Sequence, residues 1–238
     1  MNNKKQVCLP GLNKQFDFLK INLQVNPESV LVIGSGSEPA AELISNHFSC
    51  TTEIIVQDYE SLMNSRLIIG NDSNIKVSLM DYEVTDFAAE SFDLIFAQAS
   101  VSLLNRNKII KELKRILKPG GFICIGEIVS LKQDIPLFVK DIFDAAGLLP
   151  LYVDELEKYY SERKLNIIFQ QDFSETLSEY YIRYASQLKS AKYDLTDSEK
   201  SYYKKILNKI SHESNVYLKL GGDKFIGFVS LLLQKGNN

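Results

Sequence analysis

The chain has 238 residues and a formal net charge of -3, with 45% hydrophobic and 24% charged residues. This length and composition suit one α/β domain with additional elements, and the lack of a basic run argues against nucleic acid as a partner. No apolar run approaches the roughly 18 residues of a membrane-spanning helix, and no signal-peptide core follows Met1–Lys5. Cys8, Cys50 and Cys124 show no paired spacing, so we expect reduced thiols, no structural metal and a cytoplasmic location.

The N-terminal segment, residues 1–28, contains a predicted helix over residues 12–23. Phe16 and Leu19 give this helix an apolar side. Because the segment precedes the first predicted strand, it can lie over the ligand end of a sheet. The alternative is an ordinary packing helix with no ligand beneath it.

A strand, a glycine turn and a helix start follow one another directly. Residues 30–33 are apolar without a break, which is typical of a strand buried on both faces of a parallel sheet. Gly34, Ser35 and Gly36 come next, and residues 40–48 have the pattern of a helix. Such a turn lets the backbone approach a ligand closely, whereas the alternative interpretation is a tight turn without a ligand.

The next two predicted strands both end in an acidic residue. Residues 53–57 lead to Asp58, and residues 75–80 lead to Asp81. In nucleotide-binding α/β proteins an acid at the end of the second strand accepts hydrogen bonds from ribose hydroxyls. The alternative role for Asp58 is the N-cap of the helix that follows it.

The pattern of strands and helices continues beyond the acidic residues. A fourth predicted strand, residues 92–97, leads to Gln98, and an amphipathic helix spans residues 108–117. A Lys-Pro-Gly-Gly turn, residues 118–121, precedes a fifth strand over residues 122–128. This alternation predicts a doubly wound parallel sheet whose ligand site lies at the carboxyl ends of the strands.

Residues 30–128 resemble a class I S-adenosylmethionine (SAM) dependent methyltransferase. The resemblance is carried by the glycine turn, by the acids at consecutive strand ends, and by the Leu-x-Pro-Gly-Gly turn at residues 117–121. The family usually has an acid two positions before the first glycine and a third glycine two positions after the second. Val32 and Glu38 stand at those places, and Glu38 is not expected to replace the missing acid.

The resemblance implies SAM as the cofactor, with S-adenosylhomocysteine (SAH) as the product, and no metal. By resemblance, Asp58 holds the ribose hydroxyls, while Asp81, Met80 and Tyr82 flank the adenine. The complete set of residues expected to bind the cofactor is Gly34, Ser35, Gly36, Asp58, Tyr59, Met80, Asp81, Tyr82 and Gln98. Glu127 is a candidate catalytic or substrate-contacting acid at the end of the fifth strand, and its alternative is a solvated strand-end carboxylate.

The second half of the chain adds helices to the expected fold. Helices are predicted over residues 136–147, 174–189 and 196–212, with a sixth strand over 165–169 and a last, antiparallel strand over 224–233. The resulting fold is a single α/β domain over residues 1–238, with a mostly parallel, seven-stranded, doubly wound sheet. The layout resembles the small-molecule branch of the family, such as the quinone and arsenite methyltransferases.

The inserts 129–150 and 174–212 are expected to roof an acceptor pocket together with residues 1–28. The aromatic residues expected to wall this pocket include Phe16, Phe138, Phe143, Tyr180 and Tyr184. The alternative is that the helices of residues 174–212 pair with a second copy of the chain in a homodimer.

The predicted function is methyl transfer from SAM to a small-molecule acceptor by in-line displacement. One alternative is a non-catalytic protein of this fold that serves a protein partner, and a weaker one is a nicotinamide-dependent oxidoreductase. The sequence does not identify the acceptor or the atom that is methylated.

Overall fold

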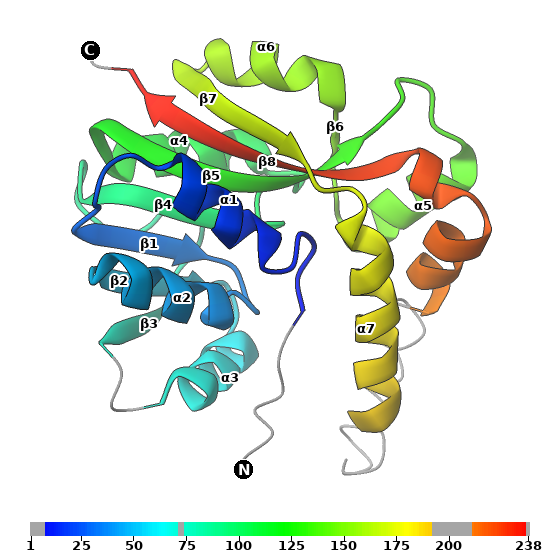
Figure 1. The fold of residues 1–238 in the computed structure, drawn as a ribbon, viewed down its shortest axis with the longest axis horizontal. Helices are drawn as coiled ribbons and strands as arrows, with labels where there is room; N and C mark the ends of the chain where they lie inside the picture. The colour runs from blue at the N-terminus through cyan, green and yellow to red at the C-terminus, as the bar shows by residue number, and fades with distance from the viewer. Residues whose placement is uncertain (1–7, 71–73, 192–210, 237–238) are drawn as a thin grey trace.

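The computed structural model describes residues 8–70, 74–191 and 211–236. Within these ranges one mixed sheet has the strand order β3-β2-β1-β4-β5-β8-β7, and a short strand β6 pairs with β5 (Figure 1). The strands are β1 (Ser29–Ile33), β2 (Thr51–Val56), β3 (Ile75–Leu79), β4 (Phe92–Gln98), β5 (Leu117–Ser130), β6 (Leu151–Tyr152), β7 (Leu165–Asp172) and β8 (Ile226–Lys235).

The sheet is parallel except at one strand. β1 pairs with β2 and β4, β2 with β3, and β4 with β5, all in parallel. β8 lies between β5 and β7 and is antiparallel to both. This confirms the doubly wound, mostly parallel sheet and the antiparallel last strand. β6 was not expected, because two residues carry no periodic signal.

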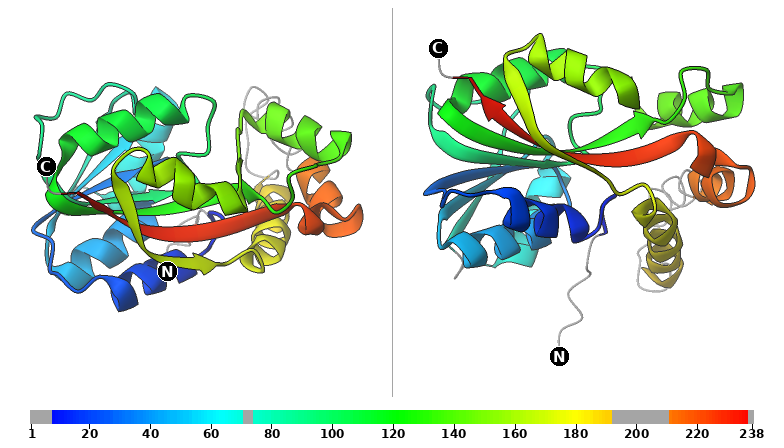
Figure 2. Two further views of the ribbon diagram at one scale, coloured as in Figure 1. Left: turned by 90° about the horizontal axis from the view of Figure 1, so that it is seen from above. Right: turned by 45° about the horizontal axis from the view of Figure 1, so that its top comes forward.

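Helices cover both faces of the sheet (Figure 2). They are α1 (Lys14–Asn22), α2 (Glu38–Phe48), α3 (Tyr59–Ile69), α4 (Arg106–Ile116), α5 (Leu137–Ala146), α6 (Leu156–Ser161) and α7 (Thr176–Ala191), with short 3-10 turns η1 (Val153–Glu155) and η2 (Gly222–Lys224). Residues 211–219 are also helical, whereas most of the helix expected over 196–212 lies outside the described residues.

Two buried clusters divide the core by face. One joins the sheet to α1, α2, α3, α5 and α7, and the other joins it to α4 and α6. Residues 30–33 of β1 are at most 1% exposed, as a strand covered on both faces requires.

Gly126 shows how closely α1 packs on the sheet. A side-chain Cβ at this position would lie 2.2 Å from Gln15 Oε1 and 2.3 Å from Phe228 Cζ. Gln15 comes from α1 and Phe228 from β8. Both side chains fill the space that is free because Gly126 of β5 has no side chain. The helix of the N-terminal segment is therefore fixed against the sheet close to the carboxyl end of β5.

The prediction that Glu127 lies at the end of the fifth strand is wrong. β5 does not end there but continues to Ser130, because β8 pairs with it from Phe122↔Gln234 to Ser130↔Ile226. A long antiparallel partner extends β5 beyond its apolar core residues. Glu127 is therefore an interior strand residue, and its side chain is fully buried rather than solvated.

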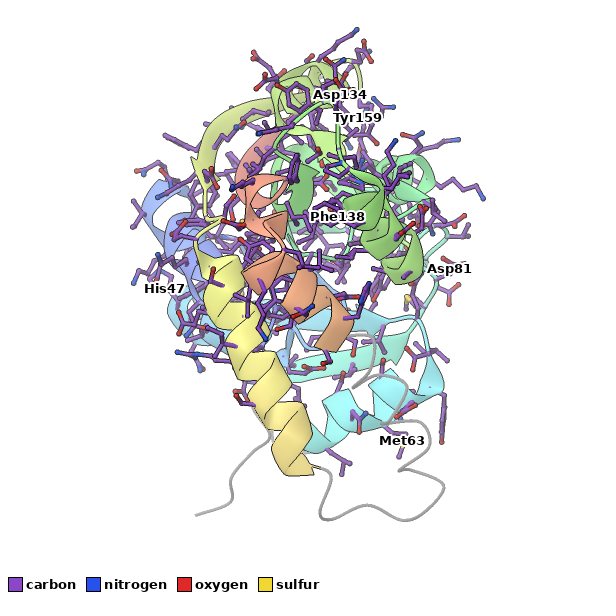
Figure 3. The ribbon with its side chains drawn as sticks, turned by 90° about the vertical axis from the view of Figure 1, so that its right-hand side faces the viewer. His47, Met63, Asp81, Asp134, Phe138 and Tyr159 are labelled. Atoms are coloured by element: carbon purple, nitrogen blue, oxygen red, sulfur yellow. The ribbon has the colours of Figure 1, made fainter. Side chains whose placement is uncertain are left out.

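The helices α5, α7 and 211–219 gather beyond the carboxyl end of the parallel strands (Figures 1 and 3). Figure 3 looks onto this edge, with Phe138 of α5 near its middle and Asp81, after β3, at one side. Leu149 N–H donates to the carbonyl of Ser102 at 2.9 Å, which ties the end of the 129–150 insert to the loop after β4.

Candidate functional site

The turn between β1 and α2 has the backbone that its glycines predict. Gly34 has φ 121° and Gly36 has φ 86°, both in the region that favours glycine. A Cβ on Gly34 would lie 3.1 Å from Ser100 Cβ and 3.3 Å from Ser37 Oγ. Ser35, between the glycines, is exposed. The turn thus brings bare backbone to the first turn of α2, where N–H groups favour negative ligand groups.

Two buried polar atoms beside this turn have no hydrogen-bond partner. They are Ser37 Oγ and Glu38 Oε2, on residues that are 0% and 1% exposed. The other carboxylate oxygen, Glu38 Oε1, accepts from Gly36 N–H at 3.4 Å and from the Ser65 hydroxyl. Buried polar atoms normally have hydrogen-bond partners. Two such atoms without a partner at one loop therefore fit a ligand whose polar groups would supply the missing hydrogen bonds.

Asp58 lies at the end of β2 and caps α3. Its Oδ1 accepts from Ser61 N–H at 2.8 Å and its Oδ2 from Ser61 Oγ at 2.7 Å. The hydrogen bond from the Ser61 backbone holds the pKa of Asp58 below its usual value. The N-cap alternative is thus present in the structure, but the side chain is exposed and each oxygen keeps lone-pair capacity for a ribose hydroxyl. The neighbouring Tyr59 is 68% exposed.

The residues after β3 differ in exposure. Tyr82 is 5% exposed, Met80 is half-buried, and Asp81 is exposed with Oδ1 accepting from Glu83 N–H at 2.9 Å. Burial raises the pKa of Tyr82, and the negative charges of Asp58 and then Glu38 raise it further. The structure thus brings Tyr82 within electrostatic reach of the carboxylates after both β1 and β2.

Gln98, at the end of β4, holds the N-terminal segment. Its Nε2 donates to the carbonyls of Pro10 and Leu12, both at 2.8 Å. Gly11 N–H also donates to Thr176 Oγ1 at 3.2 Å, which connects the same segment to the start of α7. The expected cofactor residue Gln98 therefore uses its amide donors to keep a covering segment over the carboxyl edge.

A cavity that is partly open to solvent lies between the N-terminal segment and α2, with about 330 Å³ of empty space that includes its open part. It is lined by Leu9, Leu12, Asn13, Phe16, Gly36, Pro39, Ala40, Leu43 and Gln98. Gly36 and Gln98 belong to the set predicted to bind the cofactor, and Phe16 to the set predicted to wall the acceptor pocket. The remaining residues were missed, although Leu9-Pro10-Gly11-Leu12 is an apolar turn next to the predicted helix and could have signalled a covering loop.

Glu127 faces away from this cavity into a buried polar network. It accepts from Arg106 Nη2 at 3.1 Å and from the hydroxyls of Ser102 and Tyr160. The side chains of Arg106 and Glu127 are 4% and 0% exposed. Sequence analysis missed these partners, which come from the loop after β4, from α4 and from α6.

In the described ranges no group of three or more His, Cys, Asp or Glu side chains could hold a metal ion. No helix within those ranges is long and apolar enough to cross a membrane.

Comparisons with known proteins agree with this geometry. Residues 31–125 match a family model described as a methyltransferase domain. No curated protein matches the chain in sequence.

Solved structures match nearly the whole chain in fold. A candidate sarcosine dimethylglycine methyltransferase from Galdieria sulphuraria has a TM-score of 0.74 and 16% identity, over 94% of this chain and 85% of that one. The [4+2]-cyclase SpnF has the same TM-score and identity, over 95% and 81%. Geranyl diphosphate C-methyltransferase from Streptomyces coelicolor A3(2), in complex with Mg²⁺, geranyl diphosphate and SAH, has a TM-score of 0.69 and 12% identity, over 94% and 79%.

Residues 31–125 match a methyltransferase domain, and the chain has the fold of the class I SAM-dependent methyltransferases. The resemblance read from the glycine turn, the strand-end acids and the Leu-x-Pro-Gly-Gly turn is confirmed. SAM is the cofactor of this class, and the buried orphan atoms at the glycine turn fit a ligand of its polarity.

Proposed function

We propose that this chain transfers the methyl group of SAM to a small-molecule acceptor whose body is largely apolar. The observation that carries the proposal is the cavity between the N-terminal segment and α2. Its lining combines two positions of the expected cofactor site, Gly36 and Gln98, with walls formed mainly by leucine, phenylalanine, proline and alanine. Small-molecule sites have this combination of apolar walls and few polar groups.

The cofactor supplies a methyl group already activated by its positive sulfur, so the chain must mainly bind, align and exclude water. Gly34 and Gly36 would present bare backbone to the methionine part of the cofactor, and Asp58 would accept hydrogen bonds from its ribose hydroxyls. Gln98 holds the N-terminal segment over the edge through Pro10 and Leu12. This arrangement shields the reacting atoms from solvent.

The cap is part of the proposal. The helices α5, α7 and 211–219 lie beyond the carboxyl edge (Figure 3). Tyr181 of α7 and Tyr217 have ring centroids 4.9 Å apart, and Phe138 of α5 meets Phe225 edge to face at 6.3 Å. The side chain of Tyr184 lies outside the described residues. We assign to this cap the selection of the acceptor.

The named acceptors of structurally similar proteins support a small molecule. One neighbour is a geranyl diphosphate C-methyltransferase, and another, represented by two structures, is phosphoethanolamine N-methyltransferase 2 from Haemonchus contortus. These acceptors belong to those proteins, and at 12% to 14% identity they do not fix the acceptor of this chain.

Titration calorimetry with SAM, SAH and NAD tests the cofactor, with SAM and SAH expected to bind and NAD not. Incubation with methyl-labelled SAM and a panel of isoprenoid, quinone and amine acceptors then tests transfer. NAD binding without SAM binding would contradict the proposal. Hydrogen exchange should also show added protection of residues 9–16 and of the 129–150 insert when SAM binds.

A second candidate function is chemistry without methyl transfer, or a binding role for a protein partner. The similarity to SpnF favours keeping it, because that protein shares this fold and is named a [4+2]-cyclase. Tight SAM binding with no labelled product from any acceptor in the panel would support this second candidate.

A further inference from the structure

Glu38 is a buried acid that lacks a counter-ion among the described residues. It is the first residue of α2 and is 1% exposed. Gly36 N–H and the Ser65 hydroxyl occupy Oε1, while Oε2 has no hydrogen-bond partner and the carboxylate forms no ion pair with a described residue. A buried charge in this state is costly unless a cation or a strong donor reaches it.

Two residues near Glu38, Gly36 and Tyr82, belong to the set expected to bind the cofactor. Gly36, whose N–H donates to Glu38, lines the cavity beside the N-terminal segment. The charges of Glu38 and Asp58 both act on buried Tyr82, so the two carboxylates converge on one part of the carboxyl edge. The first turn of α2 is favourable for a negative side chain, which helps to keep Glu38 in place without a cation.

The chemistry of the cofactor supplies what Glu38 lacks. SAM carries one net positive charge, because its sulfonium and ammonium groups outnumber its carboxylate. SAH has lost the sulfonium charge and is neutral overall. In a low-dielectric site an unpaired carboxylate therefore attracts SAM more strongly than SAH.

We propose that Glu38 supplies the negative charge by which this site prefers SAM over SAH. This inference rests on the proposed function, because it requires SAM to bind at the glycine turn. Val32, near the end of β1, is apolar and supplies no such charge, and nothing local in the sequence gives a reason to assign the task to Glu38. The buried, unpartnered oxygen provides that reason.

Calorimetric titration of SAM and SAH into the wild type, Glu38→Gln and Glu42→Gln tests the inference. Glu42 lies on the same helix, so its substitution removes the same charge one turn away. We expect Glu38→Gln to weaken SAM binding by about tenfold or more, the range for one charge-assisted hydrogen bond, and SAH binding by less. Glu42→Gln should keep the wild-type ratio of the two dissociation constants.

The melting temperature of the ligand-free variants separates binding from folding. Because Oε2 has no partner, Glu38→Gln should melt at or above the wild-type temperature. Glu38→Asp keeps the charge on a shorter side chain and should retain part of the preference for SAM. If Glu38→Gln does not fold, the affinities of Glu38→Asp for SAM and SAH test the inference instead.

Three outcomes would overturn the inference: unchanged affinities in Glu38→Gln, an equal loss for SAM and SAH, or an Asp variant with no preference. A wild type that binds neither ligand would instead overturn the proposed function and the inference with it. The two failures are therefore distinguishable by the wild-type titration alone.

Discussion

Arg106 and Glu127 form an ion pair that is almost completely excluded from solvent, with Nη2 and Oε2 3.1 Å apart. The hydroxyls of Ser102 and Tyr160 also donate to this carboxylate, whereas Arg106 Nε is buried without a partner. Since α4, α6, β5 and the loop after β4 meet here, the pair joins the helices α4 and α6 to the sheet.

Glu127→Gln should destabilise the protein by about 3–5 kcal/mol, because Arg106 would remain buried without its counter-charge. Urea unfolding measures this change. Glu83→Gln is the matched control, because it breaks an ion pair with Lys108 whose side chain is 73% exposed, and its effect should be much smaller. A stable Glu127→Gln protein that binds SAM but has lost turnover would contradict the structural role and support a catalytic one.

Asp58→Asn should separate the two roles of this residue. Asparagine caps helices as well as aspartate does, so the unfolding free energy should stay close to the wild-type value. SAM affinity should fall about tenfold or more, because a charge-assisted contact to the ribose is lost. Calorimetry and thermal unfolding check the two expectations.

Glu60→Gln, in the first turn of the same helix, removes one charge without a predicted ribose contact and serves as the control. Asp58→Ala should lose both affinity and about 1 kcal/mol of stability, because it also removes the cap. Unchanged SAM affinity in both Asp58 variants would refute the ribose assignment.

The ion pair of Glu112 and Arg115 should make the free energy of unfolding depend on pH in the acidic range. Burial alone would raise the pKa of Glu112, but hydrogen bonds from Arg115 and Thr85 outweigh it and lower this pKa to about 2. The ionised Glu112 therefore contributes its full stabilisation at pH values above 4.5, the ordinary pKa of a glutamate. This contribution is lost as the pH falls from 4.5 toward 2.

Glu112→Gln should flatten the pH dependence of unfolding in this window. Between pH 5 and pH 2 the unfolding free energy of the wild type should change by about 1 kcal/mol more than that of the variant. The value is this small because solvent weakens the ion pair at the Arg115 side chain, which is 40% exposed. Urea midpoints measured between pH 5 and pH 2 provide the test, and parallel curves for wild type and variant would contradict it.

Gln98→Ala should release the N-terminal segment from β4. Loss of the two hydrogen bonds to Pro10 and Leu12 should speed amide exchange in residues 9–13 by roughly tenfold and weaken SAM binding. Gln24→Ala is the control, because its amide only donates to Ile21 at an exposed site. Unchanged exchange in Gln98→Ala would show that other contacts hold the segment.

Gly126→Ala should destabilise the fold by about 2 kcal/mol or more, because the new methyl group would overlap Gln15 and Phe228. Gly236→Ala is a suitable control, since the nearest atom to its added Cβ would be Lys164 O at 3.9 Å. Equal melting temperatures for the two variants would mean that α1 can move away from the sheet at little cost.

The positions of the longer strands along the chain could be predicted because each has a local signal, whereas the two-residue strand β6 has none. Apolar runs such as residues 30–33 and the Pro-Gly-Gly turn near the start of β5 mark their own positions. The contacts of Gln98 with Pro10 and Leu12 have no such signal, because their partners are far apart in the sequence. The burial of Glu38 and Glu127 was missed for the same reason: a charged residue looks solvated until its distant neighbours are known.

The place of β8 in the sheet has a consequence for the order in which the chain can assemble. β7 joins the sheet through β8, as in the pairs Asn166↔Gln234 and Asp172↔Val229. During synthesis β1 to β5, which carry the glycine turn and both strand-end acids, leave the ribosome long before β8 does. Until β8 arrives, the far edge of β5 and the whole of β7 expose unpaired backbone groups, which favour aggregation. The nascent chain can therefore complete its nucleotide-binding half early. It depends on its last strand, β8, to cover the strand edges through which it could aggregate with other chains.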